Sequence, residues 1–174
     1  MATTETGGAA GLSDERLVEA FLTAFVGGDA DRISDLVTED CVLHQPRWPL
    51  DRAGKAAVID ATRANEGSFT DLAIEVERSV SAGDEVAAYT TARGRNVGPI
   101  RTATREIAPT GKTFEVPQFG HYRIEDGRIA EAWVLADALG IAEQLGNLPT
   151  GPGALVGILL RQFRWRLGGR GALD

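Results

Sequence analysis

Apolar residues recur at two different periods along this chain, and the change of period predicts the order of its elements. Near the N-terminus they follow the three-to-four-residue spacing of an amphipathic helix, at Leu17, Ala20, Phe21, Ala24 and Phe25. Ser13 and two acidic residues precede this stripe, which is typical of a helix start. Gly27 and Gly28 end it, so a first helix is predicted between Ser13 and Gly27.

Further helices are predicted over 30–37 and 55–65, with a short strand over 41–44 between them. From there on the pattern favours strands, over 71–81 and 85–97, joined by a tight turn. Three helices followed by a strand-rich meander predict an α+β architecture rather than a parallel sheet.

The most informative local signal is Asp126-Gly127, which lies between two β-rich runs and predicts a two-residue hairpin turn. If the two residues that flank this turn are paired with each other, the register of the two strands follows by counting away from the turn. Tyr122 then faces Glu131, and Val116 faces Asp137.

This register sorts the hairpin's side chains onto two faces, because alternate residues and cross-strand partners share a face. The face expected to line a ligand cavity holds Gln118, Gly120, Tyr122, Ile129, Glu131, Trp133, Leu135 and Asp137. The other face holds Phe119, His121, Arg123, Ala130, Ala132, Val134 and Ala136. Its small residues at 130, 132, 134 and 136 are expected to pack against a second subunit, so we expect a homodimer. A bulge at Gly120 would reverse the facing of His121.

The order GK-x(n)-R-x-x-DGRI-x-E-x-W-x-x-x-D-x-LG-x-x-x-QLG, from Gly111 to Gly146, resembles the SnoaL-like polyketide cyclases. These belong to the nuclear transport factor 2-like (NTF2-like) superfamily. Upstream, Cys41-Val-Leu-His-Gln-Pro46 resembles the family's first strand, which ends in a pocket histidine. The resemblance extends over 12–148 and implies a cone of N-terminal helices packed on a strongly curved, mostly antiparallel sheet. The superfamily places cyclases, isomerases, hydrolases, dehydratases and non-enzymes on this one scaffold.

The resemblance implies that Asp137 is an acid/base residue, and that a histidine assists it. Burial among apolar side chains would suit such a carboxyl to proton transfer near neutral pH. Alternatively, Asp137 caps the helix that opens at Ala138. His44 either binds a carbonyl or shuttles a proton, or is a partly buried structural histidine. His121 is the other candidate, although the register places it opposite Asp137.

Six more positions are expected near the cavity and substrate: Trp48, Asn96, Gln118, Tyr122, Glu131 and Trp133. Their aromatic members could form a wall for a flat ring system, although aromatic residues at such spacings also build cores. Asn96 lies in Gly94-Arg-Asn-Val-Gly98, which resembles a family segment with a pocket-lining polar residue. Glu131 could instead pair with Tyr122 or a buried arginine.

Composition narrows the function classes. The 174 residues fit one domain, and a net charge of −7 disfavours nucleic acid as a partner. One cysteine and two histidines make a metal site unexpected. No phosphate-binding loop is visible, so no cofactor is expected. Without a signal peptide pattern, a cytoplasmic location is expected.

The two ends of the chain differ from its middle. Residues 1–11 are predicted to be a disordered leader, 12–148 the SnoaL-like domain, and 149–174 a linker with an extra C-terminal helix. The apolar and basic run 154–167 could dock on its own or a partner's subunit, cover the cone as a lid, or lie on a membrane surface. It is too short to span a membrane.

The sequence therefore predicts a cofactor-independent cyclase that acts on a hydrophobic, multi-carbonyl small molecule by aldol-type acid/base chemistry. The alternatives are another enzyme on the same cone (an epoxide hydrolase, isomerase or dehydratase) or a non-catalytic binding module.

Overall fold

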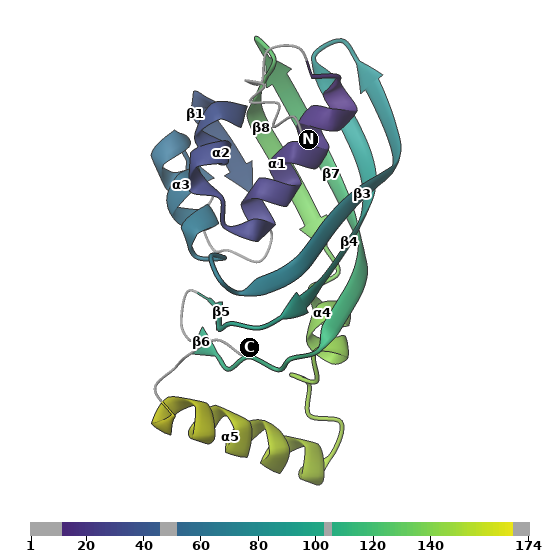
Figure 1. Cartoon of the computed structure of the whole chain (residues 1–174). Helices are drawn as coiled ribbons and strands as arrows, with labels where there is room; N and C mark the ends of the chain where they lie inside the picture. Colours follow the sequence, from purple (N-terminus) through teal and green to yellow (C-terminus); the bar gives the residue numbers. More distant parts are fainter. Residues whose placement is uncertain (1–11, 46–51, 103–105, 169–174) are drawn as a thin grey trace, which may run out of the picture.

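A computed structural model describes residues 12–45, 52–102 and 106–168 of the chain. Three helices cover one face of a curved sheet: α1 (Asp14–Gly27), α2 (Ala30–Leu36) and α3 (Lys55–Arg63) (Figure 1). The first begins directly after Ser13, as its acidic first turn predicts, and ends where Gly28 takes a left-handed conformation.

The main sheet has six strands in the order β2-β1-β8-β7-β4-β3. In that order they are Arg52–Ala53, Val37–His44, Arg128–Ala136, Thr113–Glu125, Glu85–Asn96 and Phe69–Ala82. β1 and β8 are parallel, and every other neighbouring pair is antiparallel. The predicted α+β class with a mostly antiparallel sheet is confirmed.

The remaining elements lie beyond the helical layer, at one end of the sheet (Figure 1). β5 (Ile100–Arg101) and β6 (Glu106–Ile107) form a small second sheet, and α4 (Ala138–Gln144) follows β8. The predicted extra helix is present as α5 (Pro152–Leu167) and lies against β6. None of the described helices is both long and apolar enough to cross a membrane.

The core forms between α1 and the helix-covered face of the sheet. Phe21 of α1 meets the ring of Tyr122 edge-on at 6.2 Å, and both side chains are buried. Gly120 lies beside that ring, since a Cβ there would approach the Tyr122 hydroxyl to 2.2 Å. The glycine is therefore required by close packing rather than by a bulge, and it pairs regularly with Val134.

The bulge lies instead in β8. Ile129 pairs with Ile124, but the next pair joins Glu131 to Arg123, so Ala130 is an extra residue. Because side chains alternate along a strand, this one residue reverses the facing of all of β8 beyond it.

The predicted facing of β8 is therefore wrong. Trp133 projects from the outer face, where it is 50% exposed, and Leu135 at the end of the strand is 59% exposed. Ala130, Ala132 and Val134, the expected dimer contacts, are buried instead.

Candidate functional site

A pocket of about 330 Å³ lies between the helices and the covered face of the sheet, near the start of α4. Its lining is mostly apolar, with three polar residues, and comes from α1, α3, α4, β3, β5, β7, β8 and two loops: Leu22, Phe25, Val26, Gln45, Ala61, Asn65, Phe69, Ile100, Phe114, Gln118, Val134, Leu135, Ala136, Ala138 and Ile141. A concave, apolar site with few polar groups is the usual form of a small-molecule pocket. We call it the inner pocket.

Gln118 is the polar group most deeply set in this lining. It lies on β7 between Thr90 and Ala136 and is 6% exposed. Among the described residues, nothing hydrogen bonds its Oε1, and the same holds for the buried hydroxyl of Thr90. A buried amide oxygen left unpaired is rare and costly, so it indicates a place where a polar group of a ligand would bind.

Asp137 does not project into the inner pocket. Its Oδ1 accepts a 2.8 Å hydrogen bond from the backbone N–H of Gly140, and the side chain is exposed. It therefore caps α4, which is the alternative that the sequence left open. Its neighbours Ala136 and Ala138 both line the pocket, so Asp137 lies beside the lining without being part of it. The expected burial of its carboxyl is wrong, because its side chain turns to the N-terminus of α4 instead of the cavity.

Several predicted site residues meet on the outer face of the sheet. His44 Nε2 lies 2.9 Å from Glu131 Oε1, and the His44 ring stacks on Trp133 with centroids 3.7 Å apart. Arg123 Nε lies 3.6 Å from the other oxygen of Glu131. The hydrogen bond from His44 is the main reason that the pKa of Glu131 is lowered. The second histidine, His121, shares this face.

These outer-face contacts are ion pairs and stacking rather than parts of a cavity. His121 Nε2 lies 3.4 Å from Glu85 Oε2, and both side chains are about half exposed. In the described part of the chain, neither histidine hydrogen bonds Asp137. The placement of Glu131 and Trp133 near the cavity is wrong, because both are reversed by the bulge at Ala130.

Asn96 is a structural residue and not a lining one. Its Nδ2 donates to the carbonyls of Ser68 and Gly98 at 3.0 and 2.7 Å. Its Oδ1 accepts from the N–H and hydroxyl of Thr110. These bonds tie three loops together at the end of β4, and Asn96 is fully buried.

Tyr122 is also a core residue, and burial raises the pKa of its phenol. It is absent from the lining of the inner pocket. Trp48 lies outside the described residues.

Asn65 lines the inner pocket and was missed by sequence reasoning. It follows the end of α3, and its Nδ2 donates to the carbonyl of Phe25 at 2.9 Å. No local signal separates it from any other polar residue at a helix end. Only the packing of α3 against α1 brings it to the pocket.

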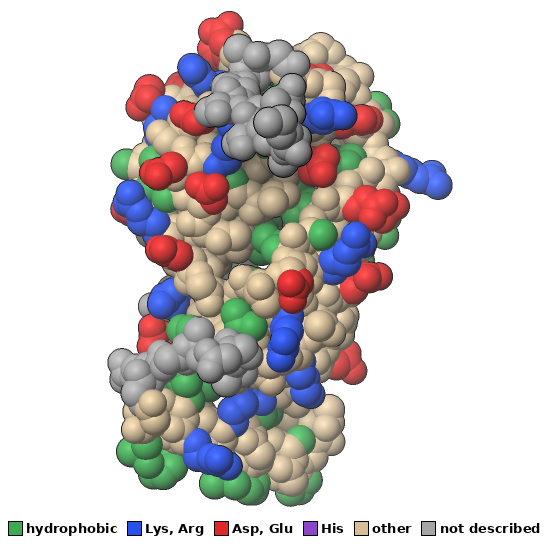
Figure 2. Space-filling view, viewed as in Figure 1, with side chains coloured by type: hydrophobic (Ala, Val, Ile, Leu, Met, Phe, Trp, Pro, Cys, Tyr) green, Lys and Arg blue, Asp and Glu red, His purple; other side chains and the backbone are tan. Residues whose placement is uncertain are grey.

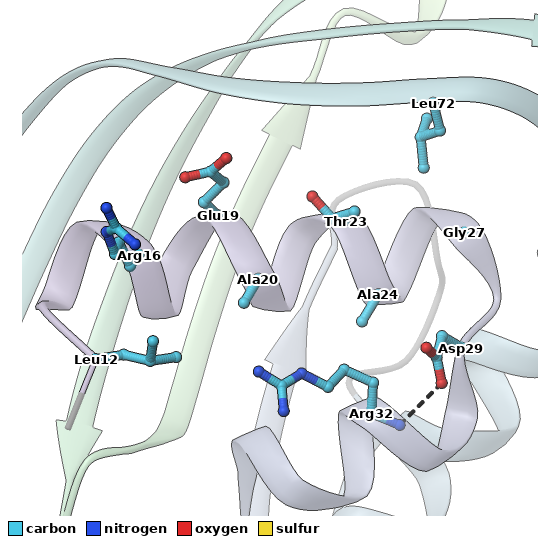
Figure 3. Close-up of a pocket in the computed structure, with 10 residues that line it drawn as sticks. All are labelled: Leu12, Arg16, Glu19, Ala20, Thr23, Ala24, Gly27, Asp29, Arg32 and Leu72. Carbon is cyan, nitrogen blue, oxygen red and sulfur yellow. Dashed lines mark hydrogen bonds between the residues drawn. The ribbon is translucent and has the colours of Figure 1, made fainter. Parts of the chain in front are cut away.

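A second hollow of about 750 Å³ runs beside α1 (Figure 3). It is an open groove, bordered by the exposed side chains of Arg16, Glu19 and Thr23, with Leu72 across it. Asp29 at its end accepts the N–H of Arg32 as the cap of α2. Because this groove is open to water, the inner pocket is the better candidate for binding a hydrophobic molecule. In the described part of the chain, no cluster of three or more histidine, cysteine or acidic residues could hold a metal ion.

The family model for SnoaL-like polyketide cyclases matches residues 15–145. The chain belongs to this family. The match includes the helical layer, the six-stranded sheet and α4, and ends before α5.

Solved structures agree with this assignment. TsrD from Streptomyces laurentii is 30% identical with a TM-score of 0.63, over 79% of this chain and 99% of that one. IdmH from Streptomyces antibioticus, proposed to be a polyketide cyclase, is 27% identical with a TM-score of 0.60, over 75% and 96%. An epoxide hydrolase of the LEH-like type from M. tuberculosis is 17% identical with a TM-score of 0.53, over 89% and 96%, and shows the shared fold alone. A search of curated proteins found no match.

In this SnoaL-like chain, the NTF2-like cone is present and its pocket is formed, but the described lining is electrically neutral. The residues that the resemblance implied as acid/base groups lie at the N-terminus of α4 (Asp137) and on the outer face (His44 and His121). Their catalytic roles remain predictions. The division of the chain at residues 11 and 148 likewise remains a prediction.

Proposed function

We propose that this SnoaL-like protein is a cofactor-independent cyclase that folds a hydrophobic, multi-carbonyl, polyketide-like molecule inside the inner pocket. The observation that carries the proposal is the Gln118 amide, which is buried in an apolar lining with its Oε1 unpaired among the described residues. A primary amide can donate to a carbonyl oxygen and accept from an enol hydroxyl. Alternating carbonyl and enol groups offer both partners.

The apolar walls would supply much of the rate acceleration. Holding a flexible poly-carbonyl chain folded in such a pocket lowers the entropic barrier to ring closure. Gln118 would hold one carbonyl in place and stabilise negative charge that develops on its oxygen.

Proton transfer is assigned to Asp137, which lies between the lining residues Ala136 and Ala138. Its carboxylate would remove a proton from a carbon beside a carbonyl, and the resulting enolate carbon would form a bond to a second carbonyl carbon. The alkoxide formed there would take the proton back from Asp137. The capping bond uses Oδ1, which leaves Oδ2 for this exchange.

Replacing Asp137 with asparagine tests this role. Asparagine caps helices as well as aspartate does, so Asp137→Asn should keep the melting temperature while turnover of a linear poly-β-keto thioester falls by orders of magnitude. Asp137→Ala should lose both turnover and about 1 kcal/mol of stability. Asp29→Asn, at the equivalent cap of α2, is the matched control and should keep full activity. Full turnover in Asp137→Asn would refute the assignment.

A non-catalytic binding module is the second candidate, and the neutral lining favours it. If a hydroxylated anthraquinone binds the wild type and Gln118→Leu weakens that binding, while the wild type turns over no linear poly-β-keto thioester, the pocket serves for binding only.

A homodimer is a further proposal, now through the outer face. Phe119 and Trp133 form an apolar strip there, each at least half exposed. Sedimentation should show a dimer for the wild type and a monomer for Phe119→Lys. A monomeric wild type would contradict the proposal.

A further inference from the structure

Helix α5 turns five partly buried residues toward the rest of the protein, Ala154, Ile158, Arg161, Gln162 and Trp165, and leaves its other side exposed. The Gln162 amide accepts from the N–H of Ala108 at 2.8 Å and donates to the carbonyl of Glu106 at 3.0 Å. Arg161 donates to the side chain of Asn147. These contacts fix which side of the helix faces the sheet.

The opposite side of α5 carries a continuous apolar stripe. Its residues are between 46% and 72% exposed: Leu155, Val156, Leu159, Leu160, Phe163 and Leu167. In Figure 2 hydrophobic side chains gather along the lower edge of the molecule, where Figure 1 places α5. We call these six residues the outer stripe. It is larger than the scattered apolar residues normal on a protein surface.

The charge of α5 is opposite to that of the rest of the chain. Residues 152–167 contain three arginines and no acidic residue, so the remainder carries −10 against −7 for the whole. Arg164 and Arg166 are exposed in the last turn, at the C-terminal end of the outer stripe. A basic end on an acidic protein orients that end toward a negatively charged surface.

We propose that α5 docks this protein on a membrane surface rich in anionic phospholipids. The outer stripe enters the boundary between headgroups and acyl chains, and Arg164 and Arg166 contact the phosphates. Interfacial helices combine an apolar face with arginines in this way. α5 is not a spanning helix.

A second copy of α5 fits the outer stripe less well. An antiparallel pair would place the arginines of one helix beside the positive N-terminal end of the other, and a parallel pair would place arginine beside arginine. No acidic residue on either helix would offset this repulsion. The proposal is independent of the pocket's function, because no residue of α5 is among those that line the inner pocket.

Flotation of the full chain with vesicles tests the proposal. The wild type should float with phosphatidylcholine vesicles that contain about one third phosphatidylglycerol, and high salt should weaken this binding. Arg164→Gln with Arg166→Gln should weaken it about thirtyfold, since each arginine near an anionic leaflet contributes roughly fivefold. Leu159→Glu with Phe163→Glu should weaken it at least tenfold, as a rough lower bound for burying two carboxylates at the interface.

Val80→Glu is the matched control. Val80 is 71% exposed on β3, away from α5, so this variant should bind like the wild type. The variants change only exposed side chains, and circular dichroism checks that each is folded. Failure of the wild type to bind, or equal binding to vesicles of phosphatidylcholine alone, would overturn the proposal. A second result would also overturn it: the wild type self-associates without binding vesicles, and the variant with both Leu159→Glu and Phe163→Glu does not self-associate. A second copy of the chain would then cover the outer stripe.

Discussion

Replacing Gln118 with methionine should stabilise the empty protein while weakening its ligand binding. The two side chains have the same length, so methionine fills the same space in the pocket wall. What it removes is an amide that is 6% exposed and whose Oε1 has no partner among the described residues.

The magnitude follows from the cost of burying an unpaired polar group. That cost is about 1–3 kcal/mol in proteins. The inner pocket, at about 330 Å³, is large enough to admit water, which would partly solvate the amide. We therefore expect a gain of about 1 kcal/mol, which for a chain of this length is roughly 2–4 °C in melting temperature.

Urea denaturation with an unchanged slope measures this gain directly. Gln144→Met is the matched control, because its amide makes two hydrogen bonds to the backbone of Glu115, at 2.8 and 2.9 Å. The same substitution there should destabilise the protein by about 1 kcal/mol. Binding of a hydroxylated anthraquinone should fall about three- to tenfold in Gln118→Met, the worth of one hydrogen bond. A destabilised Gln118→Met, or one that binds the probe as well as the wild type, would refute the reasoning that this amide is kept for a ligand at a cost in stability.

Three further predictions concern residues outside the pocket. Asn96→Ala should lower the free energy of unfolding by about 3 kcal/mol or more, because it leaves several buried backbone groups without hydrogen-bond partners. A melting temperature close to that of the wild type would contradict the role of Asn96 in joining the loops. Since the hydrogen bond from His44 holds the pKa of Glu131 below its ordinary 4.5, this contact stabilises the fold above that pH and is lost as the pH falls further. The melting temperature of Glu131→Gln should therefore fall less steeply than that of the wild type as the pH is lowered below 4.5. An equally steep fall in both proteins would show that the contact does not contribute to stability. Burial raises the pKa of the Cys41 thiol to about 12, so iodoacetamide should leave it unmodified at mildly alkaline pH until urea unfolds the protein, and rapid labelling of the native protein would contradict that burial.

Local signals in the sequence predicted the helices and the long strands, but not the short strands β2, β5 and β6 or the start of β1 at Val37. Asp126 and Gly127 both take positive φ, at 50° and 71°, as a two-residue turn of the predicted kind requires. The first helix starts after Ser13, and the strand–turn–strand around Gly83 forms as expected. Each of these features depends on a few neighbouring residues, so the chemistry of those residues alone determines the local structure.

The facing of side chains in β8 was not predictable in this way. The sequence left Asp137 with two roles and placed Glu131 and Trp133 in the cavity. The structure makes Asp137 the cap of α4 and moves the other two residues outward. The cause is one extra residue at Ala130, whose bulge has no strong local signature.

What the sequence by itself determined is the architecture: the order of helices and strands, the hairpin turn and the family that these residues share. Only the tertiary structure decided which side chains meet. His44 reaches Glu131 across 87 residues of chain through the parallel pairing of β1 with β8, and Asn65 reaches the inner pocket through α3. Side chains on a strand alternate with a period of two, so a single inserted residue exchanges the inside for the outside without altering the pattern that predicts the strand.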